Sequence, residues 1–309
     1  MLWYIGRRLL QMIPVFLGAT LIVYLLAFYT SGDPILTLAG DKPISPAVEQ
    51  RLREQYNLDQ PVLVQWLLYL KSVLTFDLGV GFNGRPLWDQ IAAAFPTTFR
   101  LAIIAVVVET IFGVAAGVIS GLRKGKLIDT TLLMLSLLLI ATPTFVLGFL
   151  AQFVFGLQLG IAPINVGRDP SWQNLLLPGF VLGGVSFAYV LRLTRTSIAE
   201  TAGADHVRTA TAKGLSRGGV VSKHVLRNSL IPVVTFIGAD LGALMGGAIV
   251  TERVFNVPGI GTLLFSSINA GEAPMIVSLV TLLVIIFLLS NLVVDLLYGV
   301  LDPRIRYAK

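Results

Sequence analysis

Long apolar runs separated by polar segments dominate the chain. Each run has about 20 residues, the length that an α-helix needs to cross about 30 Å of hydrocarbon. The runs are continuous, whereas the strands of a transmembrane β-barrel would alternate between apolar and polar residues. The pattern therefore predicts an all-α polytopic membrane protein with six transmembrane helices, at roughly 9–29, 98–121, 131–156, 175–195, 230–251 and 275–300.

A long polar segment, residues 30–97, follows the first predicted span. Helices are predicted over 46–56, where Ser45 is a suitable cap, and over 60–74. A plain connector rarely exceeds about 15 residues, which favours a docking or gating role for this segment. Residues 1–97 thus form a unit of the first transmembrane helix plus a long external segment.

A second polar segment, about 196–229, separates the fourth and fifth spans. Its sequence predicts a short helix over about 204–213 with Gly214 as the C-cap, then a turn and an amphipathic stretch that enters span five. We assign this loop to a transmembrane core at 98–303, which a basic tail at 304–309 follows.

Two prolines lie within predicted spans, Pro143 in the third and Pro178 in the fourth. Proline removes a backbone donor and clashes with the preceding turn, so both are expected to kink their helices.

Composition agrees with a membrane protein, because 55% of the 309 residues are hydrophobic, 13% are charged and the mean hydropathy is +0.81. The absence of cysteine excludes disulfides, thiolate metal sites and cysteine nucleophiles. The N-terminus resembles a signal peptide, but its apolar run reaches about Tyr29 without a small-residue cleavage site, which favours a retained span.

The net charge of +6 could indicate nucleic-acid binding, but 15 of the 23 basic residues fall in segments that lie on one side if the spans alternate. Basic residues concentrate in the cytoplasmic loops of membrane proteins. The distribution therefore predicts a multi-pass protein with both termini in the cytoplasm and no nucleic-acid partner.

Two spans carry a glycine at every fourth position. This spacing places the glycines on one helical face and lets another helix approach closely. The stripes indicate either tight packing within the chain or an interface with a second membrane subunit. The glycines are Gly113, Gly117 and Gly121 in span two, and Gly238, Gly242 and Gly246 in span five.

Glu109 and Asp240 lie within spans two and five. A carboxylate at mid-membrane is costly unless it has a partner or faces water. Both residues are therefore candidates for a translocation pathway, where one could face a substrate's ammonium group. Interhelical hydrogen bonding is the alternative, and neither residue has an obvious basic partner within the spans.

A specific motif lies in the second polar segment, where DHVRTATAKGL is followed by HVLRNSLIP. This segment resembles the cytoplasmic coupling loop of binding-protein-dependent ABC importer permeases. The general signature has glutamate where Arg208 stands and a late proline where Arg227 stands. Both departures match the dipeptide/oligopeptide branch. The stretches ERVFNVPGIGTLL and NLVVDLLYGVLDPRIR resemble the same branch, most closely the first permease of a dipeptide importer.

The resemblance implies a type I ABC importer permease fold in a bacterial inner membrane. It implies that the chain works with a second homologous permease, two cytoplasmic ATPase subunits and an external solute-binding protein. The chain has no GxxxxGK[ST] motif, so ATP and Mg²⁺ would be bound by the ATPases and this subunit would need no cofactor or metal. The residues expected to couple to an ATPase are Asp205, His206, Val207, Arg208, Thr209, Ala210, Ala212, Lys213, Gly214 and Leu215.

Dipeptides or oligopeptides are the expected substrates. Nickel complexes, haem or another small solute remain alternatives, because the solute-binding protein largely selects the substrate in this branch. A secondary transporter would favour inverted repeats and paired intramembrane charges, and no clear repeat is present. A membrane hydrolase is a weaker alternative, because the chain lacks HExxH and GxSxG motifs.

Overall fold

The computed structural model describes residues 2–29, 35, 45–81 and 84–301. The regular elements in these residues are helices, apart from one isolated β-bridge between Val80 and Pro86. The basic tail predicted at 304–309 lies outside the described residues.

Within the described residues, five helices are long and apolar enough to cross a membrane, and a bent pair brings the number to six. The six predicted spans are thus confirmed as helical segments. Some of the spans include a π-helical turn, labelled η. In chain order the segments are α1 (Leu2–Tyr29); α5 (Leu87–Val108), η1 (Glu109–Gly113) and α6 (Val114–Leu122); α7 (Leu127–Ala141), α8 (Thr144–Ala151) and η2 (Gln152–Gln158); α9 (Leu176–Ala202); α11 (Arg217–Val220), η3 (Val221–Leu226) and α12 (Arg227–Val254); and α14 (Ala273–Leu301).

Pro143 breaks the third span. Thr142 adopts an extended conformation, which is the preference of a residue that precedes proline. Helix α8 begins directly after the proline, and the axis of the span bends by 106° between α7 and α8. The predicted kink is confirmed, and the break is sharper than a kink.

Pro178 does not kink the fourth span. It is the third residue of α9, which begins at Leu176 and continues without a break to Ala202. Proline is tolerated in the first turn of a helix, because the amide it lacks would have no partner inside the helix. The predicted kink at Pro178 is therefore wrong.

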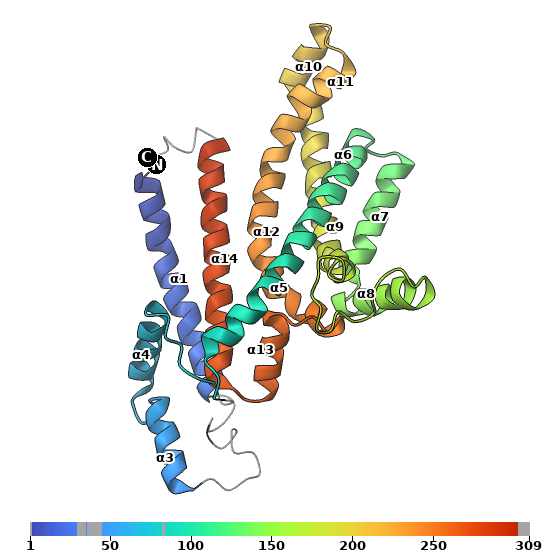
Figure 1. Ribbon diagram of the computed structural model, residues 1–309. Coiled ribbons are helices and arrows are strands. Elements are labelled where there is room, and N and C mark those ends of the chain that lie inside the picture. The colour runs from blue at the N-terminus through green and yellow to red at the C-terminus, as the bar shows by residue number, and fades with distance from the viewer. Residues whose placement is uncertain (1, 30–34, 36–44, 82–83, 302–309) are drawn as a thin grey trace.

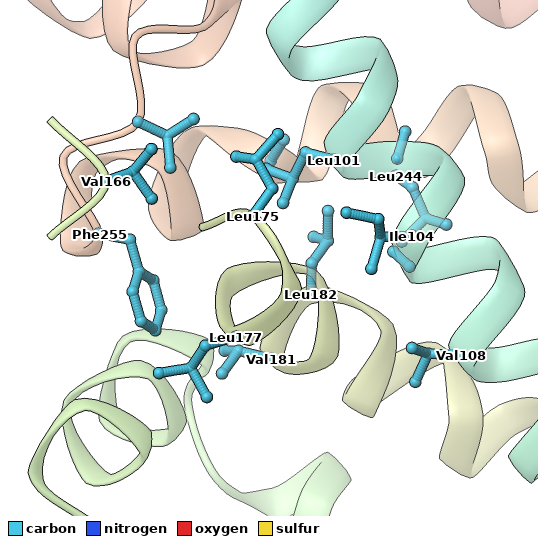
Figure 2. Close-up of a cluster of buried hydrophobic side chains, with 14 of the residues drawn as sticks. Leu101, Ile104, Val108, Val166, Leu175, Leu177, Val181, Leu182, Leu244 and Phe255 are labelled. Carbon is cyan, nitrogen blue, oxygen red and sulfur yellow. The ribbon is translucent and has the colours of Figure 1, made fainter. Parts of the chain in front are cut away.

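Helix α9 lies at the centre of the bundle, between α5 and α6 on one side and α12 on the other. The main core joins Leu101 and Ile104 of α5 to Val181 and Leu182 of α9. Figure 2 shows these side chains converging, with Phe255 from the end of α12 closing the cluster.

The first glycine stripe lies against α9. A Cβ at Gly113 would come within 2.8 Å of Val190, and a Cβ at Gly121 would come within 2.7 Å of Ile198. Gly117 is equally tight against Thr194. Because these glycines have no side chains, η1 and α6 lie directly against the Val190, Thr194 and Ile198 side chains of α9.

Two glycines of the second stripe face α14. A Cβ at Gly238 would lie 2.7 Å from Val294, and one at Gly242 would lie 3.0 Å from the Ser290 hydroxyl. Gly246 has open space on that side. Packing within the chain thus accounts for all of these glycines except Gly246.

Helix α1 lies at the edge of the bundle and packs mainly on α14. Tyr24 and Phe28 contact the first turns of α14 at Ala273 and Val277. Towards the other end, Arg8 forms an ion pair with Asp295 at 3.1 Å. The first helix of the chain is therefore held in place largely by the last.

Residues 45–81 contain the two helices predicted after the first span, α3 (Pro46–Gln55) and α4 (Val62–Leu74). The Tyr69 hydroxyl of α4 lies 2.6 Å from Thr281 of α14, which fixes α4 to the bundle. Helix α13 (Ile260–Asn269) lies at the same end of the molecule as α3 and α4. The start of α1, the end of α14, the α6–α7 turn and α10 (Asp205–Ala212) lie at the opposite end (Figure 1).

Candidate functional site

The polar segment between the fourth and fifth spans folds into a compact unit. Helix α10 follows α9 after a two-residue link, and α11 and η3 then lead into α12. The predicted helix over about 204–213 is confirmed. The unit projects beyond the ends of α6 and α7, so it is the part of the molecule that extends furthest from the bundle at this end (Figure 1).

One face of α10 seats the helix on the bundle. Val207 and Ala210 are buried in a cluster with Ile198 of α9, Val220 of α11 and Val225 of η3. A displacement of α10 must therefore disturb the end of α9 and the α11–η3 segment, which continues directly into α12, because these contacts are close-packed.

The opposite face of α10 is free. Arg208 is 76% exposed and lies 3.8 Å from Asp205, a separation that supports only a weak surface ion pair. His206 contacts Asn228 at the start of α12, at 3.3 Å. The residues of the expected coupling set that are exposed are Asp205, His206, Arg208, Thr209, Ala212, Lys213, Gly214 and Leu215.

Gly214 lies just after the end of α10 with a φ of +81°, in the left-handed region that glycine adopts at little cost. Its amide donates to the Thr211 carbonyl at 3.0 Å. The C-cap of α10 is Lys213, one position before the predicted Gly214, which follows it in the left-handed conformation. A residue with a side chain would be strained at position 214.

The two mid-membrane acids predicted from the sequence lie next to each other. The Glu109 carboxyl, which is fully buried, faces the Asp240 carboxyl and the Ser186 hydroxyl of α9. Neither Glu109 oxygen makes a hydrogen bond of ordinary geometry, and one Asp240 oxygen is likewise buried without one. The sequence separated these residues by more than a hundred positions and gave no sign of their contact.

A second buried acid, Asp129, has a full set of donors. Arg195 of α9 donates to both of its oxygens, at 2.8 and 2.7 Å. The Ser120 hydroxyl donates to the same carboxylate, as does the Gly125 amide at 2.8 Å. This cluster, the Asp129–Arg195 clamp, joins α6, the α6–α7 turn, α7 and α9.

Sequence reasoning missed the clamp. Arg195 counted as a cytoplasmic basic residue, and Asp129 lay just before the predicted start of span three at 131. The available signal was the position of the two residues: Asp129 lies in the first turn of one apolar helix, and Arg195 lies in the last turns of another.

A third buried acid, Glu252, lies near the end of α12 and holds the start of α13. Its carboxylate accepts from Thr98 of α5 at 2.6 Å and from the Thr262 amide at 2.8 Å. The Thr98 hydroxyl also accepts from the Ile260 amide at 2.8 Å. Two of the amides at the start of α13 are thus satisfied by side chains from other helices.

No group of three or more His, Cys, Asp or Glu side chains that could hold a metal ion occurs in the part of the chain that the structure describes. The described residues form a helical bundle with a projecting polar unit and with two adjacent acids, Glu109 and Asp240, on two of its spans.

Comparison with known sequences decides the family. The model of the family described as "Binding-protein-dependent transport system inner membrane component" matches residues 113–307, which is more than half of the chain. The chain belongs to this family. As a permease, it is the multi-pass inner-membrane component of a binding-protein-dependent transport system, and the resemblance drawn from the coupling motif is confirmed.

Characterised relatives extend over nearly the whole permease. It is 40% identical over 308 residues to the glutathione transport system permease protein GsiC of Escherichia coli (strain K12), covering 99% of this chain and all of that protein. It is 36% identical over 334 residues to the dipeptide transport system permease protein DppB of Alkalihalophilus pseudofirmus, with the same coverage.

The fold also has a solved counterpart. A crystal structure of an amino acid ABC transporter with histidines matches with a TM-score of 0.53 and 14% identity, over 70% of the permease and 94% of that chain. At this identity the likeness supports the ABC permease fold and nothing about substrate. The predicted fold class is confirmed.

Proposed function

We propose that the permease is one of two membrane subunits of an ATP-driven importer for small peptides, with glutathione and dipeptides as the first candidates. The observation that carries this proposal is the similarity to GsiC and DppB over 99% of the chain. A nickel complex, haem or another small solute is the alternative.

Uptake measurements test the substrate. The permease and the other subunits of its system are expressed in a strain that lacks its own peptide and glutathione importers. We expect ATP-dependent accumulation of a labelled dipeptide or of glutathione, which the unlabelled peptide competes away. Accumulation of nickel or haem without peptide uptake would contradict the peptide assignment while leaving the transport function intact.

The proposal includes partners that bind the nucleotide. No GxxxxGK[ST] motif occurs in the 309 residues, so the permease itself performs no catalysis in this scheme. Two cytoplasmic ATPase subunits hold ATP and Mg²⁺, a second homologous permease forms the other half of the pathway, and an external solute-binding protein delivers the substrate.

The orientation follows from charge. Basic residues gather at the end of the molecule that carries α10 and the α6–α7 turn, and this distribution supports a cytoplasmic position for that end. Because the chain has no cysteine, single cysteines introduced at Ser216 and at Thr75 can be labelled from either side of the membrane. We expect an impermeant maleimide added outside whole cells to label only position 75.

Helix α10 is the element that docks on an ATPase in this scheme. Its buried face fixes it to α9, α11 and η3, and η3 continues into α12, while its exposed face presents polar and basic side chains beyond the bundle. Closure of the ATPase pair would then move α9 and α12 together, since α10 cannot move without them.

Gly214→Asp tests this docking role, because a side chain at a φ of +81° strains the turn after α10 and aspartate adds a negative charge beside the exposed face. We expect transport to fall at least tenfold while the subunit still inserts and assembles. Gly218→Ala is the matched control, since Gly218 lies nearby in helical conformation with open space around it. Equal loss of transport in both variants, or normal transport in Gly214→Asp, would contradict the docking role.

The acidic pair marks the pathway in the same scheme. Asp240 is partly exposed, on a face of α12 where Ala243 and Gly247 are also exposed. A carboxylate that faces lipid is costly, so this face of α12 borders water or the partner permease. The pair would then meet the ammonium group of a passing peptide.

A further inference from the structure

Two adjoining clefts lie at the proposed cytoplasmic end, between the α6–α7 turn and the unit formed by α10 and α11. One has a volume of about 590 Å³ and the other of about 660 Å³, and they share Leu122 and Arg217 in their walls. The basic residues that line one or both are Arg123, Lys124, Lys126 and Arg217.

These basic side chains are uncompensated. No acidic residue lines either cleft, and among the described residues none of the four basic side chains takes part in an ion pair. All four are exposed. The clefts therefore present concentrated positive charge with no internal counter-ion.

The α6–α7 turn that carries three of these residues is held in one conformation. Gly125 has a φ of +79°, and its amide donates to Asp129 of the clamp. The Lys126 amide donates to the Arg123 carbonyl at 3.0 Å, which closes the turn. Because Arg195 fixes Asp129 to α9, the basic turn is anchored to the centre of the bundle before any ligand binds.

The depth of the clefts points to the class of ligand. Helix α6 ends at Leu122 and α7 begins at Leu127, so the basic turn lies where two membrane spans end. Directly below it, Leu127 is 82% exposed and Ile128 is 40% exposed. The cations thus lie at the ends of two apolar helical segments, next to exposed apolar side chains.

We propose that these clefts bind an anionic phospholipid of the cytoplasmic leaflet, with its phosphate at Arg123, Lys124, Lys126 and Arg217 and an acyl chain along Leu127 and Ile128. Basic pockets on the cytoplasmic side of membrane helices are suited to anionic headgroups. The lipid would bridge the α6–α7 turn and α11, beside the element that docks on the ATPase. The inference rests on the proposed orientation and not on the substrate.

Native mass spectrometry of the intact importer, purified in detergent, tests the site. Dioleoyl phosphatidylglycerol is titrated against dioleoyl phosphatidylcholine, which has the same chains without net charge. We expect at least tenfold tighter binding of phosphatidylglycerol. Each basic side chain near an anionic lipid contributes about fivefold, so replacing Arg123, Lys124 and Lys126 by glutamine should weaken binding about 100-fold.

Lys223→Gln is the matched control, because Lys223 is an exposed basic residue on η3 that lines neither cleft. It should keep at least half of the wild-type affinity. Equal loss in the control and the triple variant, or no preference for phosphatidylglycerol in the wild type, would overturn the proposal.

Two further experiments distinguish a bound lipid from a small anion and from a bound protein. Inorganic phosphate at millimolar concentration should not displace phosphatidylglycerol, and displacement would indicate a simple anion site. A photoreactive amino acid at position 128 should label lipid in membranes. Labelling of an ATPase subunit instead would show that a protein covers the clefts and would overturn the lipid assignment. None of these results depends on which solute the importer carries.

Discussion

Asp129 and Glu109 are buried carboxyls on neighbouring membrane segments, yet their surroundings are opposite. Asp129 accepts hydrogen bonds from Arg195, Ser120 and the Gly125 amide. Glu109 faces a second carboxyl, Asp240, and makes no hydrogen bond of ordinary geometry. The first charge is compensated within the chain, whereas the second requires a proton or a cation from outside it.

The difference separates two uses of a buried acid. The clamp joins elements that must keep their relative positions at the proposed cytoplasmic end, and Glu252 does the same for α13 at the other end. The uncompensated pair lies between these two fixed ends. In this permease the buried acids with a structural role accept hydrogen bonds from other helices or turns. The acids that we assign to the pathway include Glu109, which accepts none of ordinary geometry.

Breaking the clamp should have the largest effect. Arg195→Met leaves the Asp129 carboxylate, which is 2% exposed, without its cation, and removing one partner of a buried ion pair costs about 3–5 kcal/mol. We expect a corresponding loss of the free energy of unfolding, measured by denaturant titration of the purified subunit in detergent. The double variant Asp129→Asn with Arg195→Met should recover most of the loss. A single variant within about 1 kcal/mol of wild type would show that the pair is not a structural element.

Removing Glu252 should have the next largest effect. Glu252→Ala takes away the acceptor of the Thr98 hydroxyl and of the Thr262 amide, and a buried donor left without a partner costs about 1–3 kcal/mol. We expect the start of α13 to exchange its amide hydrogens faster, measured by hydrogen–deuterium exchange with mass spectrometry. Glu252→Gln, which keeps one carbonyl acceptor, should lie between wild type and Glu252→Ala. Unchanged exchange at α13 in the alanine variant would contradict the role of Glu252.

Neutralising the pair should have the smallest effect on stability and a clear effect on transport. Glu109→Gln and Asp240→Asn each remove a carboxyl group, and Glu109 makes no hydrogen bond of ordinary geometry that could be lost. We therefore expect the free energy of unfolding to change by no more than about 1 kcal/mol in the same denaturant titration. Uptake of a peptide with a free amino terminus should fall at least fivefold relative to an N-acetylated peptide. If both amides leave this ratio unchanged, interhelical contact is the better account of the pair.

Sequence reasoning identified the elements of the fold well and their contacts poorly. The spans, α3, α4, α10 and the break at Pro143 depend on local patterns of apolar residues, caps and proline, and all are present in the structure. Pro178 was mispredicted although the predicted start at 175 differs by one residue from the observed start of α9, because a proline in the first turn of a helix does not kink it.

The candidate sites show the same division. The coupling segment could be recognised because its residues are contiguous. The structure adds which of them face outward, since Val207 and Ala210 are buried. The Glu109–Asp240 contact, the Asp129–Arg195 clamp and the Glu252–Thr98 bond each join residues far apart in the chain. No single sequence determines such pairings, because they depend on which helical faces meet.

The packing of α1 on α14 has a consequence for biosynthesis. Helix α1 is made first, but the residues that receive Tyr24 and Phe28 begin at Ala273. At about 5–20 residues per second, roughly 10–50 s of translation separate the two helices. During that interval α1 must wait in the bilayer without its main neighbour. If translation stops before α14, Tyr24 and Phe28 of α1 have no packing partner on that helix. The packing of α1 on α14 therefore forms only after α14 has been synthesised.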